Sequence, residues 1–318
     1  MPVTLADIRA ASARIAPHVA RTPLVADPRL PQVWLKCEHR QPTGAFKLRG
    51  ATNAVLTLPR RTRAVVTAST GNHGRALAHA AQAAGIPATV CLSHLVPDNK
   101  VRAIRAMGAE VRVAGASQDE AMAEVARAVA HEGMTRIDPF DDPAVVAGQG
   151  TIGLELAEDR PDLHSVLVPL SGGGLAAGIA VAVKALIPTA RVIGVSMENG
   201  AAMAASLAAG HPVEVIETAS LADSLGGGIG ADNRVTFPLC RALLDGVILV
   251  SEAEIAAALR HLAAAGHVVE GAAAVGHAAI LSGRFRPKGP TVAILSGGNI
   301  DPTLHARIVA GANSVEAA

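Results

Sequence analysis

Short apolar runs alternate with alanine-rich helical segments along most of the chain, and this alternation constrains the fold most strongly. The runs predicted as strands are 33–35, 64–67, 88–92, 111–113, 165–169, 191–195, 247–250 and 291–295. The segments between them, such as 99–107 and 118–131, have the length and composition of helices. Strands separated by helices are typical of an α/β protein, in which helices cover both faces of parallel sheets.

Composition excludes several classes of protein. The chain has 318 residues, of which 50% are hydrophobic and 2% aromatic, and its net charge is +1. This balance does not indicate a nucleic-acid or anionic-membrane partner, and no uninterrupted apolar run is long enough for a transmembrane helix. Cys37, Cys91 and Cys240 are too far apart for a metal knuckle and odd in number, which favours reduced thiols. Since no signal-peptide pattern opens the chain, we expect a cytoplasmic protein.

Lys47 stands where a predicted strand, a turn and a predicted helix meet. The turn passes through Pro42 and Gly44, Phe46 precedes the lysine, and apolar residues at helical spacing follow it. Desolvation near an aromatic ring disfavours the ammonium, lowers the pKa from about 10.4 and frees an amine that can attack a carbonyl group. On spacing alone, a solvated lysine at the start of a helix is the more common explanation.

Two glycine-containing loops each follow a predicted strand and precede a helix. The loop 68–74 (ASTGNHG) would place backbone N–H groups at a helix N-terminus, where the α-carboxylate of an amino acid can bind. The loop 170–175 (LSGGGL) would offer N–H donors to a phosphate. It lacks both the GxGxxG fingerprint and the Lys-Ser/Thr of a P-loop. An ordinary turn capped by Ser or Thr is the alternative for the first loop, and a nucleotide-binding loop is the alternative for the second.

Taken in order, these motifs resemble those of the pyridoxal-phosphate (PLP) dependent serine/threonine dehydratases. Glu38 and the segment 43–50 (TGAFKLRG) are similar to the cofactor-attachment segment of the family, apart from the absence of its usual serine. The resemblance covers nearly the whole chain. It implies a fold-type-II PLP enzyme, similar to the tryptophan synthase β subunit, with the cofactor in the cleft between two parallel-sheet α/β domains. The implied large domain comprises residues 1–49 and 146–318, and the small domain comprises residues 50–145.

The resemblance also implies roles for individual residues. Lys47 would bear the cofactor and act as general base, and Thr70 is a second catalytic candidate because racemases of the family have a proton-donating serine there. The implied cofactor ligands are Phe46, Lys47, Asn72, Gly172, Gly173, Gly174, Leu175 and Ser296. The implied substrate ligands are Ser69, Thr70, Gly71, His73, Ser224 and Gly226. Ser296 would meet the pyridine nitrogen without holding it protonated, which favours β-elimination over transamination.

Three further features bear on the site. Glu270 either lies near the cofactor ring or is an ordinary carboxylate at a helix N-terminus. Glu198 resembles one ligand of a divalent-cation site, but Ala204 takes the place of the second carboxylate, so we expect a weak metal site or none. The scattered histidines, His267 and His277 among them, are interpreted as surface or structural residues rather than zinc ligands.

The glycine-rich segment 221–230 departs from plain threonine dehydratases. It resembles the branch of hydroxyectoine-utilisation and phenylserine dehydratases, and its missing side chains predict a pocket wider than threonine needs.

The implied function is that of a lyase of amino-acid catabolism. It would eliminate water from a β-hydroxy amino acid, of the serine/threonine type or bulkier, and release a 2-oxo acid and ammonia. A racemase or a β-replacement enzyme on the same fold is one alternative, and a non-catalytic cofactor- or nucleotide-binding protein is another. We expect a small-molecule amino-acid substrate, no nucleic-acid or membrane partner, and a homodimer, since the hydrophobic composition implies apolar surface.

Overall fold

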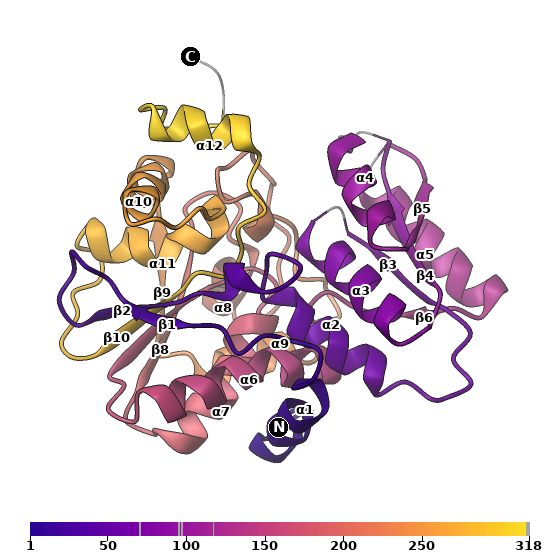
Figure 1. Ribbon diagram of the computed structural model, residues 1–318, viewed down its shortest axis with the longest axis horizontal. Helices are drawn as coiled ribbons and strands as arrows, with labels where there is room; N and C mark the ends of the chain where they lie inside the picture. Colours follow the sequence, from indigo (N-terminus) through magenta and orange to yellow (C-terminus); the bar gives the residue numbers. More distant parts are fainter. Residues whose placement is uncertain (70, 95, 97, 117, 316–318) are drawn as a thin grey trace.

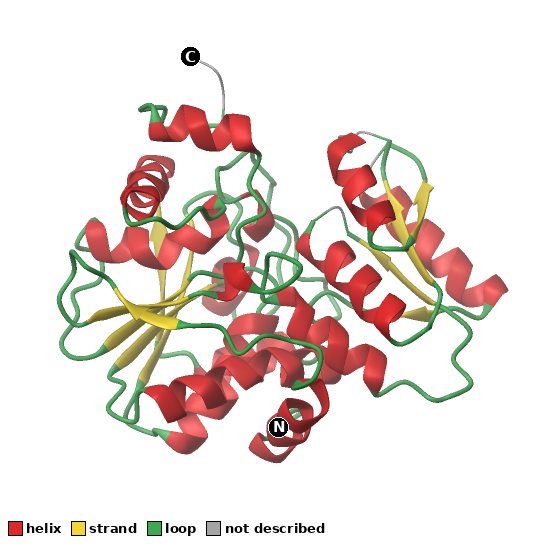
Figure 2. Ribbon diagram, viewed as in Figure 1, coloured by secondary structure: helices red, strands yellow, loops and turns green. Residues whose placement is uncertain are grey.

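The computed structural model describes residues 1–69, 71–94, 96, 98–116 and 118–315. It contains two sheets with helices on both faces of each (Figures 1 and 2). The larger sheet has the strand order β1-β2-β10-β7-β8-β9, and the smaller has the order β5-β4-β3-β6. Within the described residues every neighbouring pair is parallel except β1 with β2. The predicted α/β class with parallel sheets is therefore confirmed.

The predicted strands all form, with ends shifted by no more than a few residues. The strands are β1 (Leu24–Ala26), β2 (Val33–Lys36), β3 (Val65–Ala68), β4 (Ala88–Leu92), β5 (Glu110–Val113), β6 (Thr135–Arg136), β7 (Ser165–Pro169), β8 (Arg191–Met197), β9 (Gly246–Val250) and β10 (Thr291–Ile294). β1 and β6, which were not predicted, lie at the edges of the two sheets.

Helices connect most of the parallel strands. They are α1 (Leu5–Ile15), α2 (Lys47–Leu56), α3 (Asn72–Ala83), α4 (Asp98–Ala106), α5 (Gln118–Glu132), α6 (Pro143–Asp159), α7 (Gly174–Leu186), α8 (Ala202–Ala209), α9 (Thr236–Leu243), α10 (Glu252–Ala264), α11 (Gly271–Leu281) and α12 (Pro302–Val309), with 3-10 turns η1 (Glu38–Arg40) and η2 (Asp223–Leu225). None of the described helices is long and apolar enough to cross a membrane.

The larger sheet separates two apolar cores. Val292 and Ile294 of β10 face the core that contains α1, α6 and α7, whereas Ala293 and Leu295 face the core that contains α10 and α11. This alternation follows from the two-residue period of a strand. Figure 1 shows α6 and α7 on one side of the sheet and α10 and α11 on the other. Because both faces are covered, the strands read as continuous apolar runs.

Glycines allow α2 to lie directly against α6. A Cβ atom added at Gly148 would be 2.6 Å from the carbonyl oxygen of Arg49, and one added at Gly50 would be 2.8 Å from the carbonyl oxygen of Val145. Both glycines are buried in helices. Since α2 begins at Lys47, this contact fixes the helix that carries the lysine.

The smaller sheet has its own cores. Val65 and Val90 pack with helices α2, α3 and α4, and Val66 and Cys91 pack with α5. The predicted domain boundaries at residues 50 and 145 fall inside α2 and α6, which pack against each other. The division into two domains remains a prediction.

Candidate active site

Lys47 is the first residue of α2, and its amine lies inside the protein. The Nζ atom donates a hydrogen bond to the carbonyl oxygen of Pro139 at 2.7 Å and lies 5.3 Å from the centre of the Phe46 ring. Burial lowers the pKa of Lys47 to about 8, although the carboxylates of Asp138 and Glu270 oppose the shift. A freely solvated lysine does not fit these observations. The amine is instead poised to lose its proton near neutral pH.

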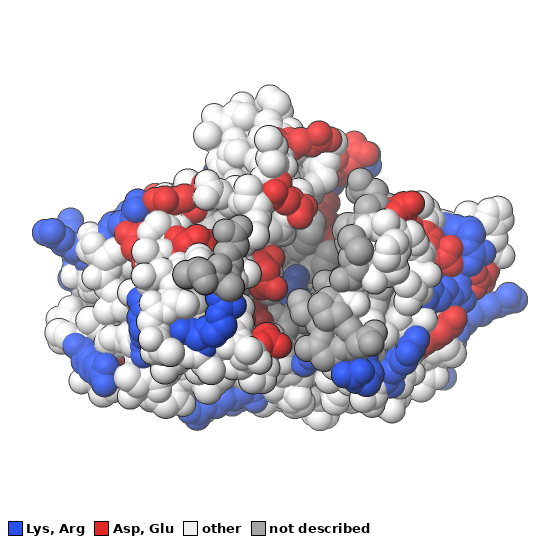
Figure 3. All heavy atoms as spheres, turned by 90° about the horizontal axis from the view of Figure 1, so that it is seen from above, with Lys and Arg blue, Asp and Glu red and all other residues white. Residues whose placement is uncertain are grey.

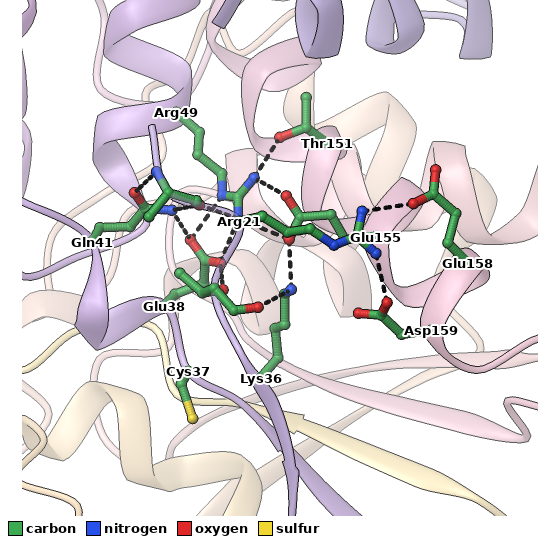
Figure 4. Close-up of polar contacts among 12 residues, drawn as sticks. Arg21, Lys36, Cys37, Glu38, Gln41, Arg49, Thr151, Glu155, Glu158 and Asp159 are labelled. Carbon is green, nitrogen blue, oxygen red and sulfur yellow. Dashed lines mark hydrogen bonds and ion pairs between the residues drawn. The ribbon is translucent and has the colours of Figure 1, made fainter. Parts of the chain in front are cut away.

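The motif residues on either side of Lys47 form a buried ion-pair network (Figure 4). Arg49 pairs with Glu38 through two hydrogen bonds, of 2.8 and 2.9 Å, and both side chains are at most 1% exposed. Arg49 also donates to Glu155 of α6 at 2.6 Å, and Lys36 of β2 donates to the same carboxylate at 2.5 Å. Burial alone would raise the pKa of Glu38, but Arg49 and the Thr22 hydroxyl hold it below its ordinary value. The network joins β2, η1, α2 and α6 around the turn that presents Lys47.

The glycine loop after β7 is enclosed by side chains. Gly173 has a left-handed backbone (φ +89°), and a Cβ atom added there would be 2.7 Å from Met203 Cε. A Cβ atom added at Gly172 would overlap the ring of Phe140, and the hydroxyl of Thr236 donates to the Gly172 carbonyl at 2.7 Å. Leu175 lies in the first turn of α7. This helix has no side-chain cap, so the N–H groups of its first turn can bind an anion.

The loop before α3 also ends without a side-chain cap. Gly71 occupies the N-cap position of α3 and provides no side-chain cap for the first N–H groups of the helix. A Cβ atom added at Gly71 would meet no atom within 4 Å, so the backbone there borders open space. Ser69 directly follows β3 and is half-buried, while Thr70 falls outside the described residues.

His73 follows Asn72 in the first turn of α3. It is 2% exposed, and its Nε2 atom lies 3.3 Å from the carbonyl oxygen of Ile137. Burial lowers its pKa to about 4, and the nearby Lys47 charge adds to the shift. The side chain is therefore neutral at neutral pH, so His73 can offer an anion its backbone N–H but no positive charge.

Asn72, Glu270 and Ser296 meet beside Lys47. Asn72 donates from Nδ2 to Glu270 Oε1 at 2.8 Å, and Ser296 accepts from the backbone N–H of Phe46 at 2.9 Å through its carbonyl oxygen. Glu270 is the N-cap residue of α11, but its side chain makes no capping bond there. The carboxylate therefore stands at the start of α11 and also lies near Lys47, so its two predicted settings coincide.

A chain of contacts joins the glycine loop, Lys47 and Ser296. Gly172 adjoins Phe140, whose neighbour Pro139 accepts from Lys47, and Phe46 then bonds to Ser296. The surface is hollowed between the two sheet-containing parts of the molecule, with acidic side chains along one wall (Figure 3). The site therefore assembles from segments that lie far apart in the sequence.

Two predicted substrate ligands have a different setting. Ser224 is exposed, and its hydroxyl donates to the adjacent Asp223 carboxylate at 3.3 Å; no described contact joins it to Lys47. Gly226 ends the same short 3-10 turn. The backbone of the same segment approaches the start of α11, because a Cβ atom added at Gly271, next to Glu270, would overlap the Leu221 carbonyl. At the predicted weak cation position, Glu198 pairs with Arg284 at 2.8 Å.

Sequence reasoning missed the segment 138–141. Asp138 lies near Lys47, and Phe140 adjoins the glycine loop. Asp141 accepts three backbone N–H bonds, each of 2.9 Å, from residues 234–236, and so fixes Thr236 against that loop. The run DPFDDP at 138–143 has the composition of a turn, but nothing in it indicated contact with the lysine.

The residues present fit pyridoxal phosphate. The Lys47 amine, with its lowered pKa, would be joined to the aldehyde of the cofactor. The uncapped N-termini of α7 and α3 could bind the cofactor phosphate and the carboxylate of a substrate. At the glycine loop, no larger side chain would fit without displacing the neighbouring residues. Asn72 and Ser296 could flank the ring.

Comparisons with known proteins agree with this fit. The family model described as pyridoxal-phosphate dependent enzyme matches residues 15–297. A Sinorhizobium fredii protein with the provisional name threonine dehydratase is 58% identical over 97% of this chain and 96% of its own. The catabolic L-threonine dehydratase TdcB of Escherichia coli K12 is 40% identical over 95% and 94%. The structure of maize serine racemase is 34% identical, covers 96% of this chain and 97% of its own, and superposes with a TM-score of 0.91. A family match over most of the chain, with relatives this similar along their full length, shows that the protein belongs to the pyridoxal-phosphate dependent enzymes of fold type II and, among them, to the ammonia-lyases of the serine/threonine dehydratase family.

Proposed function

We propose that this enzyme eliminates water from a β-hydroxy α-amino acid and releases a 2-oxo acid and ammonia. The observation that carries the proposal is the Lys47 amine, whose pKa is lowered to about 8 in a site shared with Asn72 and Ser296. The names of the relatives support threonine as one substrate.

Each residue has a separate task in this reaction. Pyridoxal phosphate, when bound, supplies an electron-withdrawing ring that makes the α-proton of the amino acid acidic. The N–H groups of Gly172, Gly173, Gly174 and Leu175 would bind the phosphate, and Asn72 and Ser296 would orient the ring. The loop 69–73 binds the substrate carboxylate through its N–H groups, which places the α-proton against Lys47.

Lys47 performs the proton transfer. Its Nζ atom takes the α-proton, the β-hydroxyl leaves as water after gaining a proton, and the resulting enamine becomes the 2-oxo acid and ammonia by adding water. Ser296 is uncharged, so it would not hold the nitrogen of a bound ring protonated. The ring would then withdraw electrons less strongly, which favours prompt loss of the β-group. A panel of β-hydroxy amino acids, assayed for both products, tests the reaction. Release of oxo acid and ammonia in equal amounts is expected, and their absence with every substrate would contradict it.

Gly173 offers a direct test of the phosphate loop. Gly173→Ala is expected to weaken the binding of pyridoxal phosphate by about 10-fold or more, since its Cβ atom meets both a left-handed backbone and Met203. Gly210→Ala is the matched control, because Gly210 has a similar φ of +82° but no atom within 4 Å of the added Cβ. Titration of the apoenzyme with the cofactor measures both. Equal losses would show that backbone strain alone acts and that the loop is not the phosphate site.

We further propose that the pocket accepts bulky substrates such as phenylserine or an amino acid derived from hydroxyectoine. The segment 226–230 supports this extension, because a Cβ atom added at Gly228 would meet only the Gly230 nitrogen, at 4.0 Å. Gly228→Val should lower kcat/KM for phenylserine by about 10-fold and leave that for threonine nearly unchanged. Gly246→Val, at another glycine with open space, is the control. If phenylserine reacts no better than threonine in the unmodified enzyme, the extension fails.

Racemisation is a second candidate activity. It is supported by the similarity to maize serine racemase and by the hydroxyl-bearing Thr70 at the position of the racemase serine. Formation of D-serine from L-serine, faster than pyruvate, would favour it over elimination. A cytoplasmic homodimer remains our proposal for the setting, and exposed apolar side chains such as Ile216 and Val268 are consistent with a subunit contact.

A further inference from the structure

Three side chains with metal-ligating atoms meet outside the catalytic site. Asp27 follows β1, His261 lies on α10 and His277 lies on α11. The Nε2 atoms of His261 and His277 are each 3.5 Å from Asp27 Oδ2, and the two ring centres are 4.7 Å apart. The side chains of Asp27 and His277 are fully buried, and that of His261 is 14% exposed.

The facing atoms lack hydrogen-bond partners. Among the described residues, none forms a hydrogen bond with Asp27 Oδ2, His261 Nε2 or either ring nitrogen of His277. The 3.5 Å separations exceed the usual range of 2.7–3.2 Å for an N–H···O bond. Buried polar atoms are nearly always satisfied, and leaving several together without partners destabilises a core. The cluster therefore calls for a ligand that all three residues can share.

The spacing suits a small divalent ion. Zinc binds histidine nitrogen at about 2.0–2.1 Å and carboxylate oxygen at about 2.0–2.2 Å in tetrahedral geometry, so two of its ligand atoms lie about 3.4 Å apart. Both measured separations are close to that value.

Backbone hydrogen bonds hold the Asp27 carboxylate in place. Asp27 Oδ1 accepts backbone N–H bonds from Arg29 at 2.8 Å and Leu30 at 3.2 Å, which orients Oδ2 toward the two imidazoles. Supporting bonds of this kind are typical of metal-ligating carboxylates. They fix the Asp27 carboxylate opposite the two imidazoles.

We propose that Asp27, His261 and His277 bind one divalent transition-metal ion of the Zn²⁺ type, with water completing the coordination. The ion would join the β1–β2 hairpin to α10 and α11, on the same side of the larger sheet (Figure 1). The ion would stabilise the packing of this hairpin against the two helices. Since α11 begins beside Glu270, the same packing would support the catalytic site.

A neighbouring cluster provides the matched control. Cys37, His39 and His267 also bring ligating atoms together. His39 and His267, however, hydrogen-bond to each other at 3.4 Å, and the Cys37 thiol donates to the Leu35 carbonyl at 3.5 Å. Substitution there should leave metal binding at the Asp27 cluster intact.

Metal titration of the chelator-treated holoenzyme tests the proposal. Co²⁺ should give the visible absorption of a tetrahedral site at one equivalent per chain, and Zn²⁺ should displace it and raise Tm. Asp27→Asn and His261→Gln should each weaken Co²⁺ affinity by about 100-fold or more, whereas His39→Gln should not. Lys47→Ala should bind Co²⁺ normally, which separates this site from the catalytic one.

Two results would overturn it. One is the absence of stoichiometric Co²⁺ or Zn²⁺ binding by the unmodified holoenzyme, a measurement that does not depend on whether any variant folds. The other is unchanged affinity in folded Asp27→Asn and His261→Gln, with circular dichroism as the check on folding.

Discussion

Lys47→Ala is expected to fold normally and to release 2-oxo acid about 10²–10⁴-fold more slowly than the unmodified enzyme. The variant loses the only side chain whose amine, with a pKa lowered to about 8, is placed to accept the α-proton among the described residues. It would also lose the proposed covalent attachment of the cofactor, so the purified protein should lack the yellow colour of the bound form. Steady-state assays and absorbance spectra measure the two losses.

A surface lysine controls for the loss of charge. Lys288 is exposed, and Lys288→Ala should keep both colour and turnover. Turnover by a folded Lys47→Ala variant at the unmodified rate would refute the role given to Lys47.

Arg49→Ala is expected to destabilise the fold by about 3–5 kcal/mol, because it leaves the buried carboxylate of Glu38 without its cation and removes one of the two cations that pair with Glu155. The turn before Lys47 should loosen as well, so cofactor affinity should fall. Urea denaturation of the apoenzyme, followed by circular dichroism, measures the change in unfolding free energy without a contribution from ligand binding.

Two further variants show whether burial causes this effect. Arg21 makes exposed ion pairs with Glu158 and Asp159, and Arg21→Ala should cost at most about 1 kcal/mol. Replacing Glu38 and Arg49 together by methionine should cost less than Arg49→Ala alone, since it leaves no charge of this pair unpartnered. A loss for Arg49→Ala as small as that for Arg21→Ala would show that the network does not support the turn.

The fold was predictable where the apolar pattern was long enough to show a period. The runs at 88–92 and 165–169 coincide with β4 and β7, since every residue in them is buried. β6 has two residues and carries no pattern of its own. α6 contains Gly148, Gly150 and Gly153, which oppose a helix by propensity. Close contact with α1, α2 and α7 explains them.

The site was predictable only in its linear motifs. Lys47 and the glycine loops stand in a fixed order along the chain, whereas Glu38 and Arg49 gained a physical role only when their ion pair became visible. Glu270 was ambiguous because its position allowed two directions for its side chain. The Asp27 cluster was invisible in the sequence, since its members are far apart in the chain and meet only through the packing of α10 and α11.

The position of the covalent bond to the cofactor tests the central claim most directly. Borohydride reduction of the holoenzyme fixes that bond, and mass mapping of the peptides then distinguishes the five lysines, Lys36, Lys47, Lys100, Lys184 and Lys288. We predict a single pyridoxyl group, on Lys47. A pyridoxyl group on another lysine, or on none, would contradict the account.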